Sequence, residues 1–335
     1  MSELEIRPLD PYDDADMDGF QEVYAAAELA EDPDAHLYSR ADGIAMLTSK
    51  DGGYTADAFG AFVGARMVGE SMVNRFLRDN LDLANVWVWV DPDHQRRGVG
   101  TRLLGHAEED ARSHGRTLAH VQARIGLDRR NGNRRFAERR GYHLANTEIE
   151  RRLALPADAD LLTRLEAEAA PYHRDYEIRT VVGPVPEELA ASYIPLSNLL
   201  VVEAPTGDLE VEENRRTVVE LAAQDRQLIE SGRTRVASYA LDREGTVVGY
   251  AVAVTTDDAY DHVDQWGTLV HPAHRGHRLG TAVKCAQVRA VGEHFPDKHV
   301  LSTTNAETNA HMVAINEALG FVIHQAYGEF QKRLV

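Results

Sequence analysis

The pattern of apolar and polar residues predicts the same kind of hairpin twice along the chain. Residues 57–76 and residues 235–254 alternate between apolar and other side chains on both sides of a glycine-containing turn, which is typical of two antiparallel strands. The turns are expected at residues 64–66 and 243–245. Each half of the chain is therefore predicted to contain part of a β-sheet.

A strongly β-prone strand, a short loop and a helix follow the first hairpin. Residues 83–90 read LANVWVWV, and residues 101–114 place apolar side chains at helical spacing. Further strands are predicted at residues 4–8 and 117–125, and further helices at residues 14–29 and 133–140. The first half of the chain is thus expected to be a mixed α/β domain.

Short landmarks of the first half recur in the same order in the second half, at offsets of roughly 172 to 181 residues. Among them are Glu5-Ile6-Arg7 and Glu177-Ile178-Arg179, Val90-x-Pro92 and Val270-x-Pro272, and Arg151-Arg152-Leu153 and Lys332-Arg333-Leu334. We predict two copies of one domain, at residues 1–155 and 176–335. A linker with a short helical pattern is predicted between them, at residues 156–175.

The composition limits the class of protein. The 335 residues carry a formal net charge of -18, and such a chain is not expected to bind nucleic acid, because phosphate neutralisation requires clustered cations. No apolar run is long enough for a membrane span, and the first residues lack the features of a signal peptide. With Cys285 as the single cysteine, no intrachain disulfide can form. We therefore expect a cytoplasmic protein with neither membrane nor nucleic acid as partner.

Two loops of the same layout each connect a strand to a helix. The first reads QRRGVG, residues 95–100, and the second reads RGHRLG, residues 275–280. Glycines let a backbone approach a ligand closely, and the N–H groups at a helix N-terminus bind anions. Neither loop matches a P-loop, and the third glycine of a dinucleotide fingerprint is missing. The loops are instead predicted to bind a pyrophosphate.

This Gln/Arg-x-x-Gly-x-Gly pattern resembles the loop of the GNAT acyltransferase superfamily that binds the pyrophosphate of acetyl-CoA. Each copy also ends in a segment similar to the C-terminal signature of the family, with Gly141-Tyr142 and Gly320-Phe321. The resemblance covers nearly the whole chain as a tandem pair, an architecture that mycothiol synthase shares. It implies two tandem GNAT-like domains, each with a mixed, mostly antiparallel central sheet flanked by helices, and acetyl-CoA as co-substrate.

The resemblance also implies which residues touch acetyl-CoA. Backbone groups of the strand before each loop contact the pantetheine arm, and the loop and the start of the helix contact the pyrophosphate. In the first copy these residues are Val88, Val90, Gln95, Arg96, Arg97, Gly98, Val99, Gly100 and Thr101. In the second copy they are Thr268, Val270, Arg275, Gly276, His277, Arg278, Gly280, Asn305 and Asn309.

The two copies match the family pattern in different places. Arg278 stands where the family usually has a glycine, so the first loop is the better match. The family asparagine that touches the cofactor corresponds to Asn309 in the second copy. In the first copy the same count reaches Arg130, with Asn131 one residue further on.

The resemblance leaves the acid that protonates the departing thiolate open. The family often uses a tyrosine there, and this chain has Ala137 and Asn316 in its place. Neither side chain donates a proton as a phenol does. Tyr260, Tyr327 or a water molecule would then have to protonate the thiolate.

A primary amine must lose a proton before it attacks, and a carboxylate on the central sheet is a suitable base. Asp264, on the strand before the second loop, is the first candidate, with a solvated strand-end acid as the alternative interpretation. Glu70, in the first hairpin, is a weaker candidate. No metal site is predicted, because the histidines around the second loop lack the spacing of a ligand set. They are His262, His271, His274 and His277.

Together these features predict an N-acetyltransferase that moves an acetyl group from acetyl-CoA to a primary amine of a small molecule in a direct ternary complex. The first copy is expected to bind acetyl-CoA better, and the second to be the site of transfer. The chain is expected to act as a monomer or a homodimer. Two alternatives are a non-catalytic acyl-CoA-binding regulatory module and a protein or peptide N-acetyltransferase.

Overall fold

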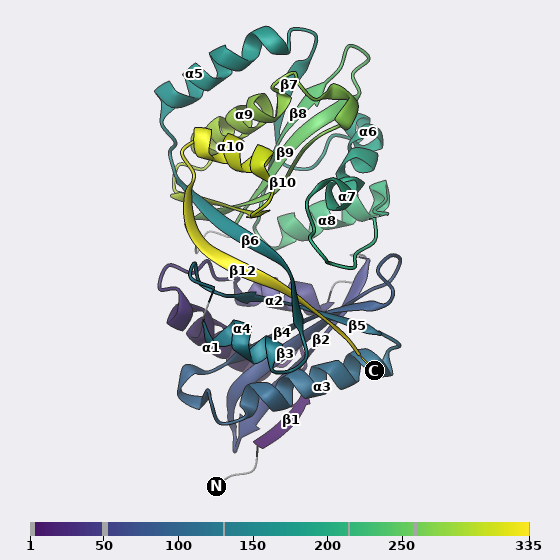
Figure 1. Ribbon diagram of the computed structural model, residues 1–335, viewed down its shortest axis with the longest axis vertical. Helices are drawn as coiled ribbons and strands as arrows, with labels where there is room; N and C mark the ends of the chain where they lie inside the picture. The colour runs from purple at the N-terminus through teal and green to yellow at the C-terminus, as the bar shows by residue number, and fades with distance from the viewer. Residues whose placement is uncertain (1–3, 49–52, 130, 214, 257–259, 335) are drawn as a thin grey trace. The chain divides into compact units, whose positions relative to one another are not determined.

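The computed structural model describes residues 4–48, 53–129, 131–213, 215–256 and 260–334 (Figure 1). Contacts between residues divide the chain into two compact units. Unit 1 contains residues 1–123, 131–145 and 328–335, and unit 2 contains residues 124–130 and 146–327. Each unit therefore combines residues from both halves of the chain.

Unit 1 is built on five strands of the first half and the end of the last strand. Its elements are β1 (Leu4–Pro8), α1 (Asp14–Glu31), α2 (Arg40–Thr48), β2 (Tyr54–Val63), β3 (Arg66–Phe76), β4 (Leu83–Val90), η1 (Pro92–His94), α3 (Val99–Ser113), β5 (Leu118–Arg124) and α4 (Gly132–Glu138). The strand order is β1-β2-β3-β4-β5-β12. Strands β1 to β4 pair in antiparallel fashion, and β4 and β5 pair in parallel.

Unit 2 repeats this plan. Its elements are β6 (His143–Ala154), α5 (Ala159–Ala169), η2 (Ala170–Tyr172), β7 (Glu177–Val182), α6 (Glu187–Asn198), α7 (Leu200–Glu203), α8 (Val218–Glu230), β8 (Arg235–Leu241), β9 (Val247–Thr255), β10 (His262–Val270), η3 (Pro272–His274), α9 (Leu279–His294), β11 (Val300–Ala306), α10 (Ala310–Ala318) and β12 (Val322–Arg333). The strand order is β6-β11-β10-β9-β8-β7, and β10 and β11 are the parallel pair. The predicted mixed, mostly antiparallel α/β fold is thus confirmed.

The last strand of each copy is divided between the two units. Strand β6 enters unit 2 at Asn146 and pairs with β11, with Ala154 opposite Val300. Strand β12 enters unit 1 at Gly328. The ranges 1–155 and 176–335 describe the repeat in the sequence, whereas the compact units exchange these strands.

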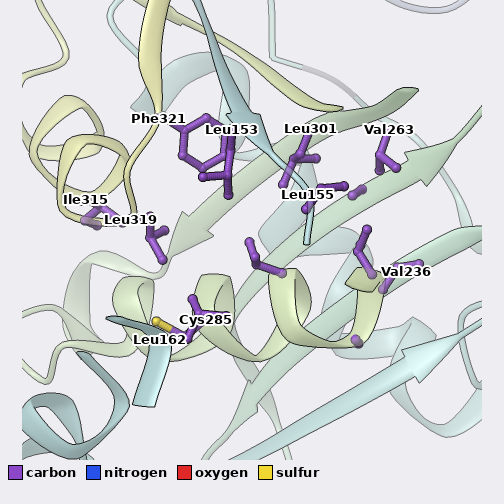
Figure 2. Packing of buried hydrophobic residues seen from close by; sticks show 14 residues of the cluster. Leu153, Leu155, Leu162, Val236, Val263, Cys285, Leu301, Ile315, Leu319 and Phe321 are labelled. Carbon is purple, nitrogen blue, oxygen red and sulfur yellow. The ribbon is translucent and has the colours of Figure 1, made fainter. Parts of the chain in front are cut away.

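The segment predicted as a linker, residues 156–175, carries helix α5, which packs into the core of unit 2. Leu162 of α5 is 3% exposed and lies in one apolar cluster with Cys285 of α9 and Leu319, the C-cap of α10. Figure 2 shows this cluster, with the thiol of Cys285 beside Leu162. Cys285 has no exposed surface, so it is a packing residue. Leu162 is buried among apolar side chains of unit 2, and a linker would not make such contacts.

Helices cover both faces of each sheet. In unit 1, α3 packs on one face through Val99 and Leu103, and α1 packs on the other through Met17 and Phe20. We call the second of these the α1–α2 face. Trp89 of β4 lies on it, with its ring edge-on to Tyr24 at a centroid distance of 5.4 Å. In the described part of the chain, none of the helices has the length and hydropathy needed to cross a membrane.

Candidate active site

In both units the parallel strand pair parts shortly after it begins. Residues 83–85 of β4 pair with residues 118–120 of β5, and residues 262–265 of β10 pair with residues 300–303 of β11. Beyond these residues the parallel pairing ends. The rest of β4 and β10 therefore has backbone N–H and C=O groups that do not bond to the parallel neighbour. An extended ligand can bind between parted strands through such groups.

The residues predicted to contact a pantetheine arm lie in these parted segments. Val88 and Val90 occupy the end of β4, and Thr268 and Val270 occupy the end of β10. Strand β10 carries a β-bulge between Gln265 and Gly267, whereas the described pairing of β4 with β3 contains no such shift.

The two predicted anion loops have the same backbone conformation, although their glycines differ in position. In the first loop Arg96 has a φ of 61° and Gly98 a φ of 87°. In the second loop Gly276 has a φ of 85° and Arg278 a φ of 52°. Gly98 and Arg278 each directly precede the helix as its N-cap. Each loop therefore holds one non-glycine residue in the left-handed region, and Arg278 does not change the path of the chain.

Side chains of the second loop are already engaged within unit 2. The guanidinium of Arg278 lies 4.6 Å from the centroid of the Tyr172 ring and donates to the Glu168 carbonyl at 3.4 Å. Arg275 forms an ion pair with Glu203 at 2.5 Å. His277 Nδ1 lies 3.1 Å from the carbonyl of Tyr172. The cations of this loop are thus directed to protein partners.

The first loop differs in this respect. Arg96 and Arg97 are exposed, and neither side chain has a hydrogen bond or an ion pair among the residues that the structure describes. Gln95, by contrast, donates from Nε2 to the Val90 carbonyl at 3.3 Å, as Arg275 donates from Nε to the Val270 carbonyl at 3.4 Å. Gln95 and Arg275 tie the loop to the strand end, whereas Arg96 and Arg97 are available to an anion.

Residues at the start of the helices serve packing. A Cβ at Gly100 would lie 3.4 Å from Val90 and 3.6 Å from the Phe136 ring, and a Cβ at Gly280 would lie 3.1 Å from Ile315. These glycines let each helix approach the strand and the next helix closely. Val99 is buried against Leu103, and Thr101 accepts a hydrogen bond from Arg140.

The asparagine that seemed to be missing from the first copy is Asn131. Its side chain accepts from the Arg134 N–H at 3.2 Å and caps α4, as Asn309 accepts from the Met312 N–H at 3.2 Å and caps α10. The two residues have the same position at a helix start, and a count from the following glycine misses this by one residue. Asn305 accepts a hydrogen bond from Asn316 at 2.7 Å.

The structure gives Asp264 a cationic partner. Its carboxylate lies 3.2 Å from Nη2 of Arg233, and it is still in the paired part of β10, opposite Ser302. A permanently charged guanidinium stabilises the ionised carboxylate and makes it a poor proton acceptor. The assignment of Asp264 as base is therefore not supported by its surroundings.

Tyr260 precedes β10, and its carbonyl accepts from Lys298 Nζ at 2.6 Å, next to the start of β11. Tyr260 therefore lies at the N-terminal end of β10, whereas the loop at residues 275–280 follows its C-terminal end. Tyr260 thus precedes β10 at the end of the strand away from the parted segment, and its role as acid stays a prediction.

Glu70 has unusual surroundings. It has no exposed surface, and neither carboxyl oxygen has a hydrogen-bond partner among the described residues. It lies opposite Trp89 in the pairing of β3 with β4, on the α1–α2 face. Burial raises the pKa of Glu70 well above its usual value.

One polar group on the α1–α2 face was not predicted. His120 Nε2 lies 2.5 Å from Glu329 Oε2, and His120 Nδ1 lies 3.0 Å from Asn85 Oδ1. Gln122 donates to the other carboxylate oxygen of Glu329 at 2.6 Å. All of these residues belong to unit 1, because Glu329 lies in the exchanged end of β12. A signal in the sequence is that Glu150 and Glu329 have the same position in the last strands of the two copies.

The fold and these loops define a tandem α/β protein with two anion-binding loops beside parted parallel strands. The model of the Acetyltransferase (GNAT) family matches residues 15–142 and 201–321. The chain therefore belongs to the Acetyltransferase (GNAT) family, with two such domains.

Solved structures of similar proteins share this fold. A tandem GNAT protein from the clavulanic acid biosynthesis pathway, in a structure without acetyl-CoA, is 25% identical with a TM-score of 0.78 over 99% of both chains. A GCN5-related N-acetyltransferase from Sphaerobacter thermophilus is 16% identical with a TM-score of 0.68, over 99% of this chain and 96% of its own. A search of curated proteins found no significant match.

Proposed function

We propose that the protein is an acetyl-CoA-dependent N-acetyltransferase that acetylates a primary amine of a small molecule by direct attack in a ternary complex. The observation that carries this proposal is the combination in unit 1 of parted β4 and β5 strands with Arg96 and Arg97, which lack protein partners in the described structure. The pantetheine arm would bind along β4, and the pyrophosphate would bind at the N-terminus of α3.

Unit 1 is also the proposed site of transfer, in place of unit 2. The pyrophosphate would have to displace the contacts of Arg275 with Glu203 and of Arg278 with Tyr172 in unit 2. The base expected there, Asp264, is paired with Arg233. The second copy of the repeat would then supply the end of β12 to unit 1, and unit 2 would have no turnover of its own.

A small-molecule acceptor is supported by the similar tandem GNAT protein, which comes from the clavulanic acid biosynthesis pathway. The polar groups of the α1–α2 face, His120, Asn85 and Gln122, suit an amine with few apolar contacts. We place the enzyme in the cytoplasm as a monomer or a homodimer, without nucleic acid or membrane as partner.

The test is an activity assay with acetyl-CoA and either a lysine-containing peptide or one of three amines of different classes, namely spermidine, glucosamine and lysine. Release of CoA thiol and the mass of the acetylated amine are measured together. We expect turnover of at least one amine by the wild type, and loss of it in R96E/R97E. Binding of acetyl-CoA without turnover of any amine would favour the regulatory module. Acetylation of a peptide alone would favour a protein N-acetyltransferase.

A further inference from the structure

His120 lies at the point where β4 and β5 part. It is the last residue of β5 that pairs with β4, opposite Asn85. Because side chains alternate along a strand, Asn85 and Trp89 share one face of the sheet, and Trp89 packs against α1 there. His120 therefore faces the α1–α2 side, at the inner end of the gap between the strands.

An arm anchored at residues 95–100 and extended along β4 leads to this point. It passes Val90 first and Asn85 last, over roughly 17 Å of strand. The thioester at the far end of such an arm would come next to His120. An amine that approaches from the α1–α2 face meets the imidazole on its way to the thioester.

The surroundings of His120 are those of a group that takes up a proton. Nε2 lies against the Glu329 carboxylate and Nδ1 lies against the side-chain amide of Asn85, so a neutral ring with its proton on Nε2 donates to Glu329 and leaves Nδ1 as its acceptor atom. The Glu329 side chain is 6% exposed, and that of His120 is 21% exposed. The carboxylate is thus fixed and buried, whereas the ring can exchange a proton with ligand or water.

We propose that His120 accepts a proton from the acceptor amine and that Glu329, supplied by the exchanged strand β12, is its positioning residue. This inference rests on the proposed function. The amine arrives as an ammonium and passes one proton to Nδ1 of neutral His120, while Nε2–H stays bonded to Glu329. The amine nitrogen then bonds to the acetyl carbon, and the C–S bond breaks. The thiolate takes the second amine proton, and the imidazolium returns its proton to water.

Unit 2 provides a matched position without this pair. Strands β6 and β12 each contain 12 residues, and each begins two residues after a glycine of positive φ, Gly141 and Gly320. The eighth residue is Glu150 in one strand and Glu329 in the other. Glu150 is 2.7 Å from Arg152 Nε, so its partner is a guanidinium that keeps its charge.

The histidine has no counterpart in unit 2 either. The third residue of β5 is His120, and the third residue of β11 is Ser302. The Ser302 hydroxyl has no hydrogen-bond partner in the described part of the chain. Glu150 instead accepts from Gln325 and from Tyr327, each at 3.0 Å. Unit 2 therefore offers a buried carboxylate at the same place, next to a guanidinium and with a serine at the position of the histidine.

The test uses H120Q, E329Q and E329D, with E150Q as the matched control, in the full-length protein. Steady-state kinetics are measured with acetyl-CoA and whichever of spermidine, glucosamine and lysine the wild type acetylates. We expect H120Q to lower kcat roughly 100-fold and E329Q to lower it roughly tenfold, with KM for acetyl-CoA unchanged. E329D should recover part of the loss, and E150Q should keep the wild-type kcat.

Two further readouts separate chemistry from structure. The thermal midpoint and the affinity for acetyl-CoA should be unchanged in H120Q, and free imidazole should raise the rate of H120G. An H120Q variant with wild-type kcat would overturn the proposed roles of His120 and Glu329, and the proposed acetyltransferase activity would be unaffected. Equal losses of kcat in E329Q and E150Q also overturn it. A wild type that acetylates none of the three amines overturns both proposals.

Discussion

Lys284 is a fully buried lysine in α9, and its replacement by methionine tests the electrostatics of unit 2. The side chain has no exposed surface, and its Nζ donates to Asn316 Oδ1 at 2.7 Å and lies 5.0 Å from the centroid of the Phe321 ring. Burial lowers the pKa of Lys284 from 10.5 to about 7, and the charge of the neighbouring Cys285 opposes this. Between these values the unfolded chain holds a proton that the folded chain lacks.

The free energy of unfolding of the wild type should therefore rise with pH between about 7 and 10.5. The difference between the two pKa values corresponds to a total of about 5 kcal/mol. Removal of the lysine leaves Asn316 Oδ1 without this donor, which costs about 1 to 3 kcal/mol. K284M should thus be more stable than the wild type by about 2 kcal/mol at pH 7, and no more stable than the wild type near pH 10.

The assay is urea unfolding followed by circular dichroism at pH 7, 8, 9 and 10. V283A, which shortens a neighbouring buried apolar side chain, is the control and should lower stability by the same amount at each pH. If the free energies of the wild type and K284M ran parallel over this range, Lys284 would keep the same charge in both states and the reasoning would be refuted.

Three further predictions concern single side chains. E70Q should increase the free energy of unfolding relative to the wild type, and this difference should grow as the pH rises above 4.5. Burial raises the pKa of Glu70, so the folded wild type retains a proton that the unfolded chain loses. Urea unfolding at pH 5 and 8 measures the difference. L162A should cost about 2 to 5 kcal/mol, and an unchanged thermal midpoint would make residues 156–175 a linker after all. N131A should cost about 1 kcal/mol through loss of the α4 cap, visible as faster hydrogen exchange in α4.

Local patterns were sufficient for the elements that carry the site. The alternation in residues 57–76 and 235–254 predicted both hairpins, and the run at residues 83–90 coincides with β4. The loop sequences predicted a strand–loop–helix connection in each copy. The comparison of glycine positions was misleading, because Arg278 adopts the left-handed conformation that Gly98 adopts in the first loop.

Long-range contacts were beyond local patterns. His120 and Glu329 are separated by 209 residues, and they meet only because β12 enters unit 1. The sequence around Asp264 does not indicate its ion pair with Arg233, because Arg233 lies before the preceding hairpin. The engagement of Arg278 with Tyr172 likewise depends on the packing of the segment that follows α5. These contacts are the ground on which we propose transfer in unit 1, whereas the sequence alone favoured the second copy for transfer.

The most direct test of the account is a calorimetric titration with acetyl-CoA of the wild type, R96E/R97E and R275E/R278E. Both double variants change the charge of one loop by the same amount. We predict one equivalent bound by the wild type and by R275E/R278E, and none by R96E/R97E. Loss of binding in R275E/R278E together with normal binding in R96E/R97E would contradict the assignment of acetyl-CoA to unit 1.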